Sequence, residues 1–436
     1  MRMSGLTLDS LPPIHIPLRF FLTAPWFGIL AAMVLLFSGP ELWTSHWNPA
    51  LIGLTHLFTL GFMTMIMLGA LFQLLPVLSG EQIPGGSLLA FAVHLLLVAG
   101  VLCLSAGFAL HEYFLLGVAS VLLAVALVGF AVAIGSKLVT NIAGGDSIHA
   151  LRLAVAALLV TIGLGCYRAL AYLYPLEFPL NLTMLHVSWA LLGWVLILIM
   201  GISFQVIPMF QVTPDYPSRL TRFIPPVIFT GLLLLAFVQA PVAVAGLVII
   251  MGAAVLIYAG FSLRLLQRRK RRLMDVSVRF WQLGLSCLIF AVLLFWLVFL
   301  LPGVAGLVMT PARGLLLAGV LMIPGFACSI IMGMLQKIVP FLAFLHLQRH
   351  CATNMRAIRS LPNMHGFISP ARSIWLLRIH TVAIVTLLGA VIYGPLTGVA
   401  GLVLLLDFGW LAFLVIHAAL LYAGTRRNIA AMEADK

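Results

Sequence analysis

Two histidines inside apolar segments are the residues of this chain best suited to bind a haem or a metal. His56 lies five residues before Gly61, and His186 lies seven residues before Gly193. An imidazole in hydrocarbon needs a hydrogen-bond partner or a metal, because an unpaired polar group there costs several kcal/mol. Haem iron takes imidazole ligands from facing helices. We therefore predict that His56 and His186 are axial ligands of a haem, with copper as the alternative metal.

Other polar groups in the apolar segments have accessory or structural roles in this interpretation. Arg168 and Arg313 are candidates to meet the propionates of a haem, and Asp407 is a second candidate partner for Arg168. For His56 and His186 the competing interpretation is a structural hydrogen bond to a neighbouring helix. That is the favoured interpretation for three further embedded histidines: His94, His380 and His417. The remaining histidines are assigned to loops: His15, His46, His111, His149, His346, His350 and His365.

The composition places these residues in a membrane. Apolar residues make up 63% of the 436 residues and charged residues only 8%, whereas soluble domains carry roughly a quarter charged residues. The net charge of +13 comes from Lys and Arg that gather in short loops. Such residues set membrane topology, so we expect lipid and not nucleic acid as the partner. The five cysteines are scattered, and the sequence identifies no catalytic residue.

Runs of 18 or more apolar residues predict transmembrane helices. The chain has twelve such runs, of which the seventh is short. Basic residues concentrate in alternate loops, so we expect both termini in the cytoplasm. We also expect the protein to reside in a bacterial inner (cytoplasmic) membrane. We predict an all-α polytopic membrane protein with a single membrane domain, 1–436. The expected spans are 20–38, 50–78, 87–108, 114–135, 152–174, 182–210, 223–238, 241–262, 280–301, 314–345, 374–394 and 397–423.

A spacing of 132 residues divides the chain into three copies of one unit. It separates Gly61 from Gly193 and Gly325, Gly69 from Gly201 and Gly333, and Pro76 from Pro208 and Pro340. We predict three pseudo-symmetric four-helix repeats, at about 15–140, 150–270 and 279–425. The glycines allow close helix contact, and each proline marks a kink or an end.

The histidines do not follow this symmetry. Val320 stands at the third-repeat position that matches His56. Gln73, Gln205 and Lys337 occupy one repeat position near the cytoplasmic side, where hydrogen bonding and snorkelling are favoured over a proton path.

The motif around the first histidine resembles a helix of the haem-copper oxidase subunit I superfamily, with the cbb3-type oxidases and nitric oxide reductases as nearest relatives. The residues are His56-x-x-x-x-Gly61-Phe62, then Gly69-Ala-Leu-Phe, then Pro76. His186-Val-Ser-Trp189 before Gly193-Trp194 resembles the sixth helix of that family, which holds a copper-ligating histidine. The family's histidines on helices 7 and 10 have no counterpart in 223–238 or 314–345. The resemblance therefore does not support terminal oxidase activity.

The resemblance implies a b-type haem at His56 and His186, and copper as a second possibility. The implied roles are electron transfer, handling of haem or copper, or a response to nitric oxide, with an electron-donor or other membrane subunit as a partner. The alternative is a protein of another class, either a cofactor-free permease or a structural membrane subunit. Transporter signs such as acidic residues at mid-membrane on several helices are absent from the sequence.

Overall fold

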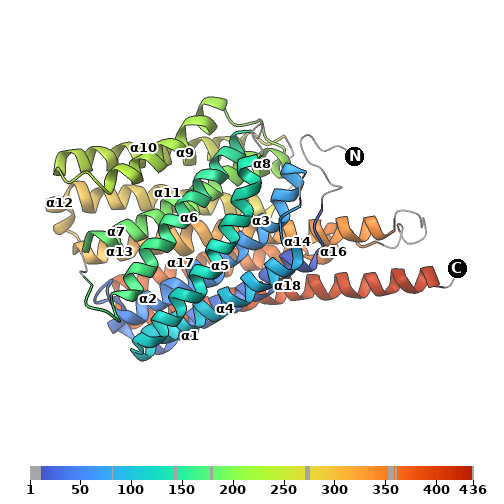
Figure 1. Ribbon diagram of the computed structural model, residues 1–436, viewed down its shortest axis with the longest axis horizontal. Helices are drawn as coiled ribbons and strands as arrows, with labels where there is room; N and C mark the ends of the chain where they lie inside the picture. Colours follow the sequence, from blue (N-terminus) through green and yellow to red (C-terminus); the bar gives the residue numbers. More distant parts are fainter. Residues whose placement is uncertain are drawn as a thin grey trace.

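The computed structural model describes residues 11–80, 82–140, 145–176, 180–270, 275–351, 358 and 361–434. The described part of the chain is mostly helical and contains no strand. Twelve of its helices are long and apolar enough to cross a membrane. They run side by side as one bundle (Figure 1). The chain is therefore an all-α polytopic membrane protein, as the sequence predicts.

Each predicted span coincides with a helix or a short series of helical segments. The seventh, predicted to be short, is an 18-residue helix, α9. The twelve are α1 (His15–Ser38), α2–η3–α3 (Pro49–His56, Leu57–Thr64, Met65–Ser79), α4 (Gly86–Leu110), α5 (Tyr113–Thr140), α6 (Asp146–Leu170), α7–η4–α8 (Leu180–Ser188, Trp189–Leu196, Ile197–Gln211), α9 (Ser218–Leu235), α10 (Pro241–Gln267), α11 (Val276–Leu300), α13–η5–α14 (Pro311–Val320, Leu321–Cys328, Ser329–His350), α17 (Pro370–Ile392) and α18 (Thr397–Ala434). Short helices connect them: η2 (Pro40–Trp43), α12 (Pro302–Gly306), α16 (Met364–Phe367) and η6 (Gly394–Leu396).

Three composite helices form the centre of the bundle: α2–η3–α3, α7–η4–α8 and α13–η5–α14, called the central helices below. Between 72% and 83% of their most apolar windows is buried, against 28–50% for the other nine spans. The other helices therefore surround the central ones and present most of their apolar side chains to lipid.

The repeated glycines lie where each central helix packs against α1, α6 or α11. A Cβ built on any of them would come within 3.0 Å of the facing helix, closer than ordinary atomic contacts allow. This explains why glycine recurs at these positions. The closest approaches are Gly61 to Phe27 2.5 Å, Gly69 to Phe20 2.7 Å, Gly193 to Ala157 2.8 Å, Gly201 to Ala150 2.8 Å, Gly325 to Cys287 3.0 Å and Gly333 to Phe280 2.5 Å.

Each central helix contains an eight-residue π-helical segment, and the three segments are again 132 residues apart: η3, η4 and η5. Segment η5 packs against both η3 and η4. Trp194 of η4 donates a hydrogen bond from Nε1 to Thr64 Oγ1 of η3 over 3.2 Å. The repeat thus extends to backbone geometry, and the three segments meet at the centre. Single-turn π segments are rare and are frequent at functional sites.

The ends of the central helices differ. Helices α3 and α8 stop three residues after Pro76 and Pro208, whereas α14 continues for ten residues beyond Pro340, to His350. The range 314–345 contains no histidine, but the predicted end of this span needs correction, because the helix continues to His350 and includes His346 and His350.

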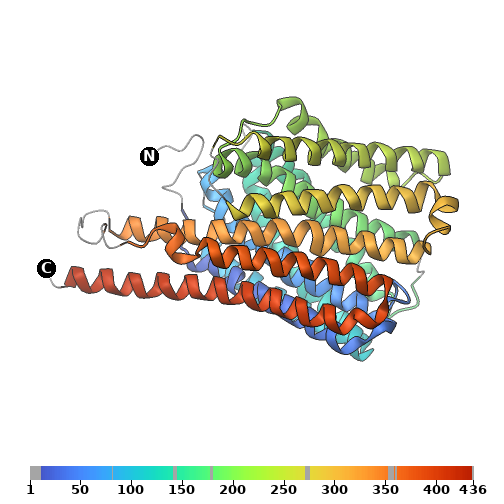
Figure 2. The same ribbon diagram turned by 180° about the vertical axis from the view of Figure 1, so that it is seen from behind.

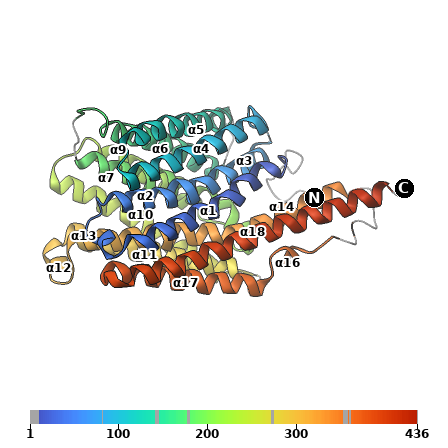
Figure 3. The same ribbon diagram turned by 90° about the horizontal axis from the view of Figure 1, so that it is seen from below.

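The first and last helices pack against each other. A Cβ at Gly28 of α1 would lie 2.0 Å from the Phe408 ring of α18, and one at Gly401 of α18 would lie 2.7 Å from the backbone nitrogen of Leu36. Figure 3 shows α1 beside α18. Both termini lie at the same end of the bundle, and α18 extends beyond it (Figure 2).

Lys and Arg mark that same end. Among the described Lys and Arg residues, only Arg168 and Arg313 belong to the opposite half of the bundle. Five further arginines in the predicted basic loops and leader lie outside the described residues: Arg2, Arg271, Arg272, Arg356 and Arg359.

Candidate metal centre

The structure brings His56 of α2 and His186 of α7 together. Their ring centroids are 6.4 Å apart, and the ring planes differ by 25°. The two residues are 130 positions apart in sequence and sit in helices from different repeats. They meet at the end of the bundle opposite the termini, because α2 and α7 are the first segments of helices that run toward the terminal end.

The hydrogen bonds of the two rings define which nitrogen is free. His56 Nδ1 donates to the carbonyl of Ile52 over 2.8 Å, and His186 Nδ1 donates to the carbonyl of Thr161 over 3.1 Å. A carbonyl only accepts, so each Nδ1 carries the proton and each Nε2 keeps its lone pair. Neither Nε2 has a hydrogen-bond partner among the described residues. A neutral imidazole held in this way is in the form that binds a metal.

The distance between the ring centroids, 6.4 Å, matches the distance expected for two rings bonded to one metal. Two metal–nitrogen bonds of about 2 Å each, plus the half-widths of two rings, place the centroids roughly 6 Å apart. No group of three or more His, Cys, Asp or Glu that could hold a metal occurs in the described part of the chain. Two ligands are too few for a tetrahedral zinc site. They are sufficient for haem iron, whose other ligands come from the porphyrin.

Aromatic side chains and the backbone of α6 at Gly165 surround the pair. Phe108 of α4 lies alongside His56, with centroids 6.2 Å apart and planes 16° apart. Tyr172 meets Phe108 edge-on at 5.8 Å. At Gly165 of α6 a Cβ would lie 3.0 Å from His186 Cε1, so the imidazole packs directly on the helix backbone.

Of the two predicted arginines, the structure brings one to the histidine pair. Arg168 lies three residues after Gly165 on α6 and is close enough to His186 for electrostatic interaction. Its guanidinium carbon is 5.9 Å from the centroid of the Trp47 ring. Arg313 is an exposed residue at the start of α13 and has no described hydrogen bond or ring contact with either histidine.

The predicted pairing of Arg168 with Asp407 is wrong. Asp407 Oδ2 is bound to His380 Nδ1 over 2.7 Å, and both side chains are buried. This partnership was not predictable from the sequence, because His380 and Asp407 lie on different helices, α17 and α18, that only the packed bundle brings into contact.

The structural hydrogen bonds predicted for the other embedded histidines are confirmed. His94 Nε2 is 2.9 Å from Thr23 Oγ1, and His417 Nε2 is 3.2 Å from Arg372 Nη1. His380 is bonded to Asp407, as described above. None of these rings faces a second histidine in the described hydrogen bonds and ring contacts.

Five of the histidines assigned to loops lie in helices instead: His15, His149, His346 and His350 near the ends of long helices, and His365 in the short helix α16. His346 is buried. It follows Gly325 by 21 residues, which is about 32 Å along a helix at 1.5 Å per residue. It therefore lies near the end of the bundle opposite His56 and His186.

Lys337 forms an ion pair with Asp275, which goes beyond the predicted snorkelling. Asp275 also caps α11, since Oδ1 accepts from the backbone nitrogen of Ser277 over 3.0 Å. Burial pushes the pKa of Asp275 upward. The bonds from Lys337 and Ser277 outweigh this and hold the pKa below its ordinary value.

The fold and the paired histidines define an integral membrane protein with a two-imidazole site. No protein-family model matches the chain, and no curated protein is significantly similar to it.

Proposed function

We propose that this protein binds a b-type haem in the cytoplasmic membrane of a bacterium, with His56 and His186 as the two axial ligands. The observation that supports this role most directly is the meeting of two imidazoles, each with Nδ1 bonded to a carbonyl and Nε2 unused. Haem supplies one-electron chemistry when it is bound. The residues of the chain hold it, orient it and limit access to it.

The surroundings of the pair suit a flat, largely apolar group with charged edges. Phe108 offers aromatic surface beside His56, and Tyr172 packs edge-on against Phe108. Arg168 is a cation next to His186, where a propionate would find a charged partner. Arg313 stands at the same end of the bundle and is a second candidate for a propionate.

The side of the membrane follows from the basic residues. The terminal end carries nearly all described Lys and Arg, so the termini are cytoplasmic by the positive-inside rule. The histidine pair then lies toward the outer face. An electron donor would reach the haem from that side, and we propose electron transfer as the role, without the dinuclear centre of an oxidase.

Copper is the second candidate. An imidazole pair is also suited to a copper ion, and the ring separation of 6.4 Å accommodates two metal–nitrogen bonds without a porphyrin. Metal analysis separates the two, because haem gives iron together with porphyrin, whereas the copper site gives copper alone.

The test is visible spectroscopy with metal and porphyrin analysis on protein purified after expression with a haem supply. We expect one haem per chain and a low-spin spectrum. His56→Ala and His186→Ala should each lose the low-spin form, or the haem altogether. His94→Ala is the matched control, since His94 is bonded to Thr23 and should leave the spectrum unchanged.

Two outcomes would contradict haem binding at this pair. One is a colourless, metal-free preparation that is folded by gel filtration, which would favour the permease or structural alternative. The other is a haem spectrum that survives both single substitutions unchanged, because the ligands would then be elsewhere.

A further inference from the structure

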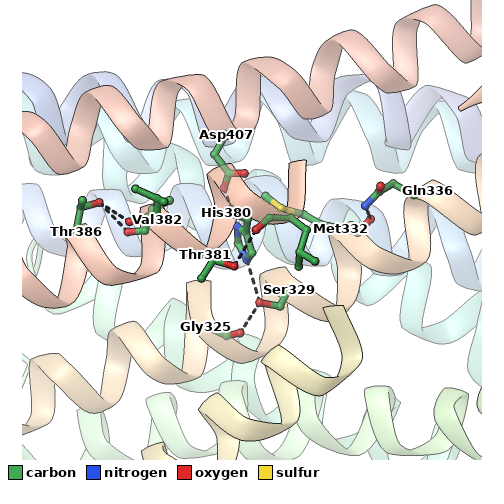
Figure 4. Close-up of polar contacts among 11 residues, drawn as sticks. Gly325, Ser329, Met332, Gln336, His380, Thr381, Val382, Thr386 and Asp407 are labelled. Atoms are coloured by element: carbon green, nitrogen blue, oxygen red, sulfur yellow. Dashed lines mark hydrogen bonds and ion pairs between the residues drawn. The ribbon is translucent and has the colours of Figure 1, made fainter. Parts of the chain in front are cut away.

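A second polar cluster lies in the interior of the third repeat, away from the histidine pair. Ser329 of α14, His380 of α17 and Asp407 of α18 converge there (Figure 4). All three residues are at most 1% exposed. His380 Nδ1 is 2.7 Å from Asp407 Oδ2, and His380 Nε2 is 2.9 Å from Ser329 Oγ. Three buried side chains thus form a connected chain of polar groups.

The positions of the hydrogens follow from the acceptor at the end of this chain. Ser329 Oγ lies 2.5 Å from the carbonyl oxygen of Gly325, which can only accept. The serine hydroxyl therefore donates to Gly325, and Ser329 Oγ accepts from Nε2–H of His380. The contact between Nδ1 and Asp407 needs a hydrogen of its own. Both ring contacts are satisfied only when His380 and Asp407 together hold one proton more than a neutral imidazole beside a carboxylate.

The charge balance leads to the same proton count. Without the extra proton the pair carries a net charge of −1 at a site with no solvent exposure, which is unfavourable by several kcal/mol. With it, the net charge is zero. The described groups that interact electrostatically with Asp407 are His380 and the thiol of Cys328 in η5. From α11 the uncharged ring of Phe280 faces His380 at 5.8 Å. No described Lys or Arg supplies a compensating charge.

One acceptor in the cluster is unused. Asp407 Oδ1 is buried and receives no hydrogen bond from any described residue. Buried polar atoms in native proteins are nearly always bonded. A carboxylate oxygen left open in this way is the atom at which a proton can arrive at or leave the pair.

We propose that Asp407, His380 and Ser329 form an intramembrane proton-binding site that takes up and releases a single proton. On release, the proton passes from the pair to water, and the pair becomes an imidazole beside a carboxylate. Nε2 or Nδ1 then lacks a hydrogen. The Ser329 hydroxyl turns from the Gly325 carbonyl to Nε2 and becomes the donor in that contact.

The site is coupled to the centre of the bundle through Gly325. This residue belongs to η5, the π segment that packs against η3 and η4. When Ser329 turns away, the Gly325 carbonyl loses its bond from Oγ. The protonation state therefore changes the bonding of the backbone at the contact between the three repeats. This proposal does not depend on haem binding.

The experiment is solid-state NMR of full-length protein in lipid bilayers with 15N-labelled histidine, using His380→Gln to assign the signals of His380. At neutral pH we expect both ring nitrogens of His380 to be protonated. If the proton resides on the carboxyl group instead, infrared spectroscopy should show a protonated carboxyl band that is absent in Asp407→Asn. Either result places one proton on the pair.

Asp407→Asn tests the role of the carboxylate and preserves its size. We expect His380 to become neutral in this variant, with a single protonated nitrogen, Nε2. His94 is the control within the same spectra, because it has a hydroxyl partner and no carboxylate, and it should remain neutral in both proteins. The proposal is overturned if wild-type His380 is neutral and Asp407 ionised at neutral pH. It is also overturned if Asp407→Asn leaves His380 doubly protonated.

Discussion

The close contact at the repeated glycines can be tested by adding a single methyl group. Gly333→Ala places a Cβ 2.5 Å from Cβ of Phe280. Carbon atoms prefer about 3.5–4.0 Å, so α14 and α11 must separate locally by roughly 1 Å. The blocking atom is the first carbon of the phenylalanine side chain and cannot rotate away. Overpacking of this kind costs about 1–3 kcal/mol.

Gly319→Ala is the matched control, since Gly319 is a helical residue of the same central helix and has no atom within 4 Å of its Cβ position. Both substitutions gain about 1 kcal/mol of helix propensity, which cancels in the comparison. We therefore expect Gly333→Ala to be less stable than Gly319→Ala by about 1–3 kcal/mol. Thermal unfolding in detergent, followed by tryptophan fluorescence, measures the difference. Equal stability of the two variants would refute the packing argument.

Three further predictions concern groups outside the two proposed sites. Asp275→Asn keeps a good helix cap but loses the ion pair with Lys337, so we expect a loss of about 1 kcal/mol at pH 7. Because the pKa of Asp275 is lowered in the folded state, this contribution is present above about pH 4 and disappears as pH falls below it, which chemical unfolding at several pH values will measure. Trp194→Phe and Thr64→Val each remove the buried hydrogen bond between η4 and η3. Each substitution should lower the free energy of unfolding by about 1–2 kcal/mol. If the losses of the two single variants add fully in the double variant, the two side chains do not form a direct bond. Burial raises the pKa of Tyr216 to about 12, so stability should be unaffected below about pH 10 and fall between pH 10 and 12. Ultraviolet absorbance should show this phenol ionising near pH 12 in the folded protein and near pH 10 once the protein is unfolded.

The membrane spans were predictable because an apolar run of sufficient length has few other possible structures. The glycine repeat also carried structural information, since a Cβ at Gly61, Gly193 or Gly325 would meet the neighbouring helix. The π segments were not predictable, because their residues are ordinary apolar ones and the extra residue per turn is imposed by the packing of three helices.

The histidine pair was partly predictable. Sequence placed His56 and His186 at similar depth, and the fold added their 6.4 Å contact and the two carbonyls that fix the tautomers. The assignment of Arg168 to Asp407 failed because charge alone does not specify a partner among twelve helices. Histidine is not counted among the charged residues of a sequence, so His380 was not recognised there as the hydrogen-bond partner of Asp407.

The contact between α1 and α18 has a consequence for biosynthesis. The ribosome delivers α1 before α18, yet Phe408 packs directly on Gly28. Helix α1 is therefore in the bilayer without this contact until Phe408, 380 residues after Gly28, has been synthesised. Nascent chains that end before α18 leave the surface of α1 around Gly28 uncovered, and this exposed surface is a feature that membrane quality control can recognise.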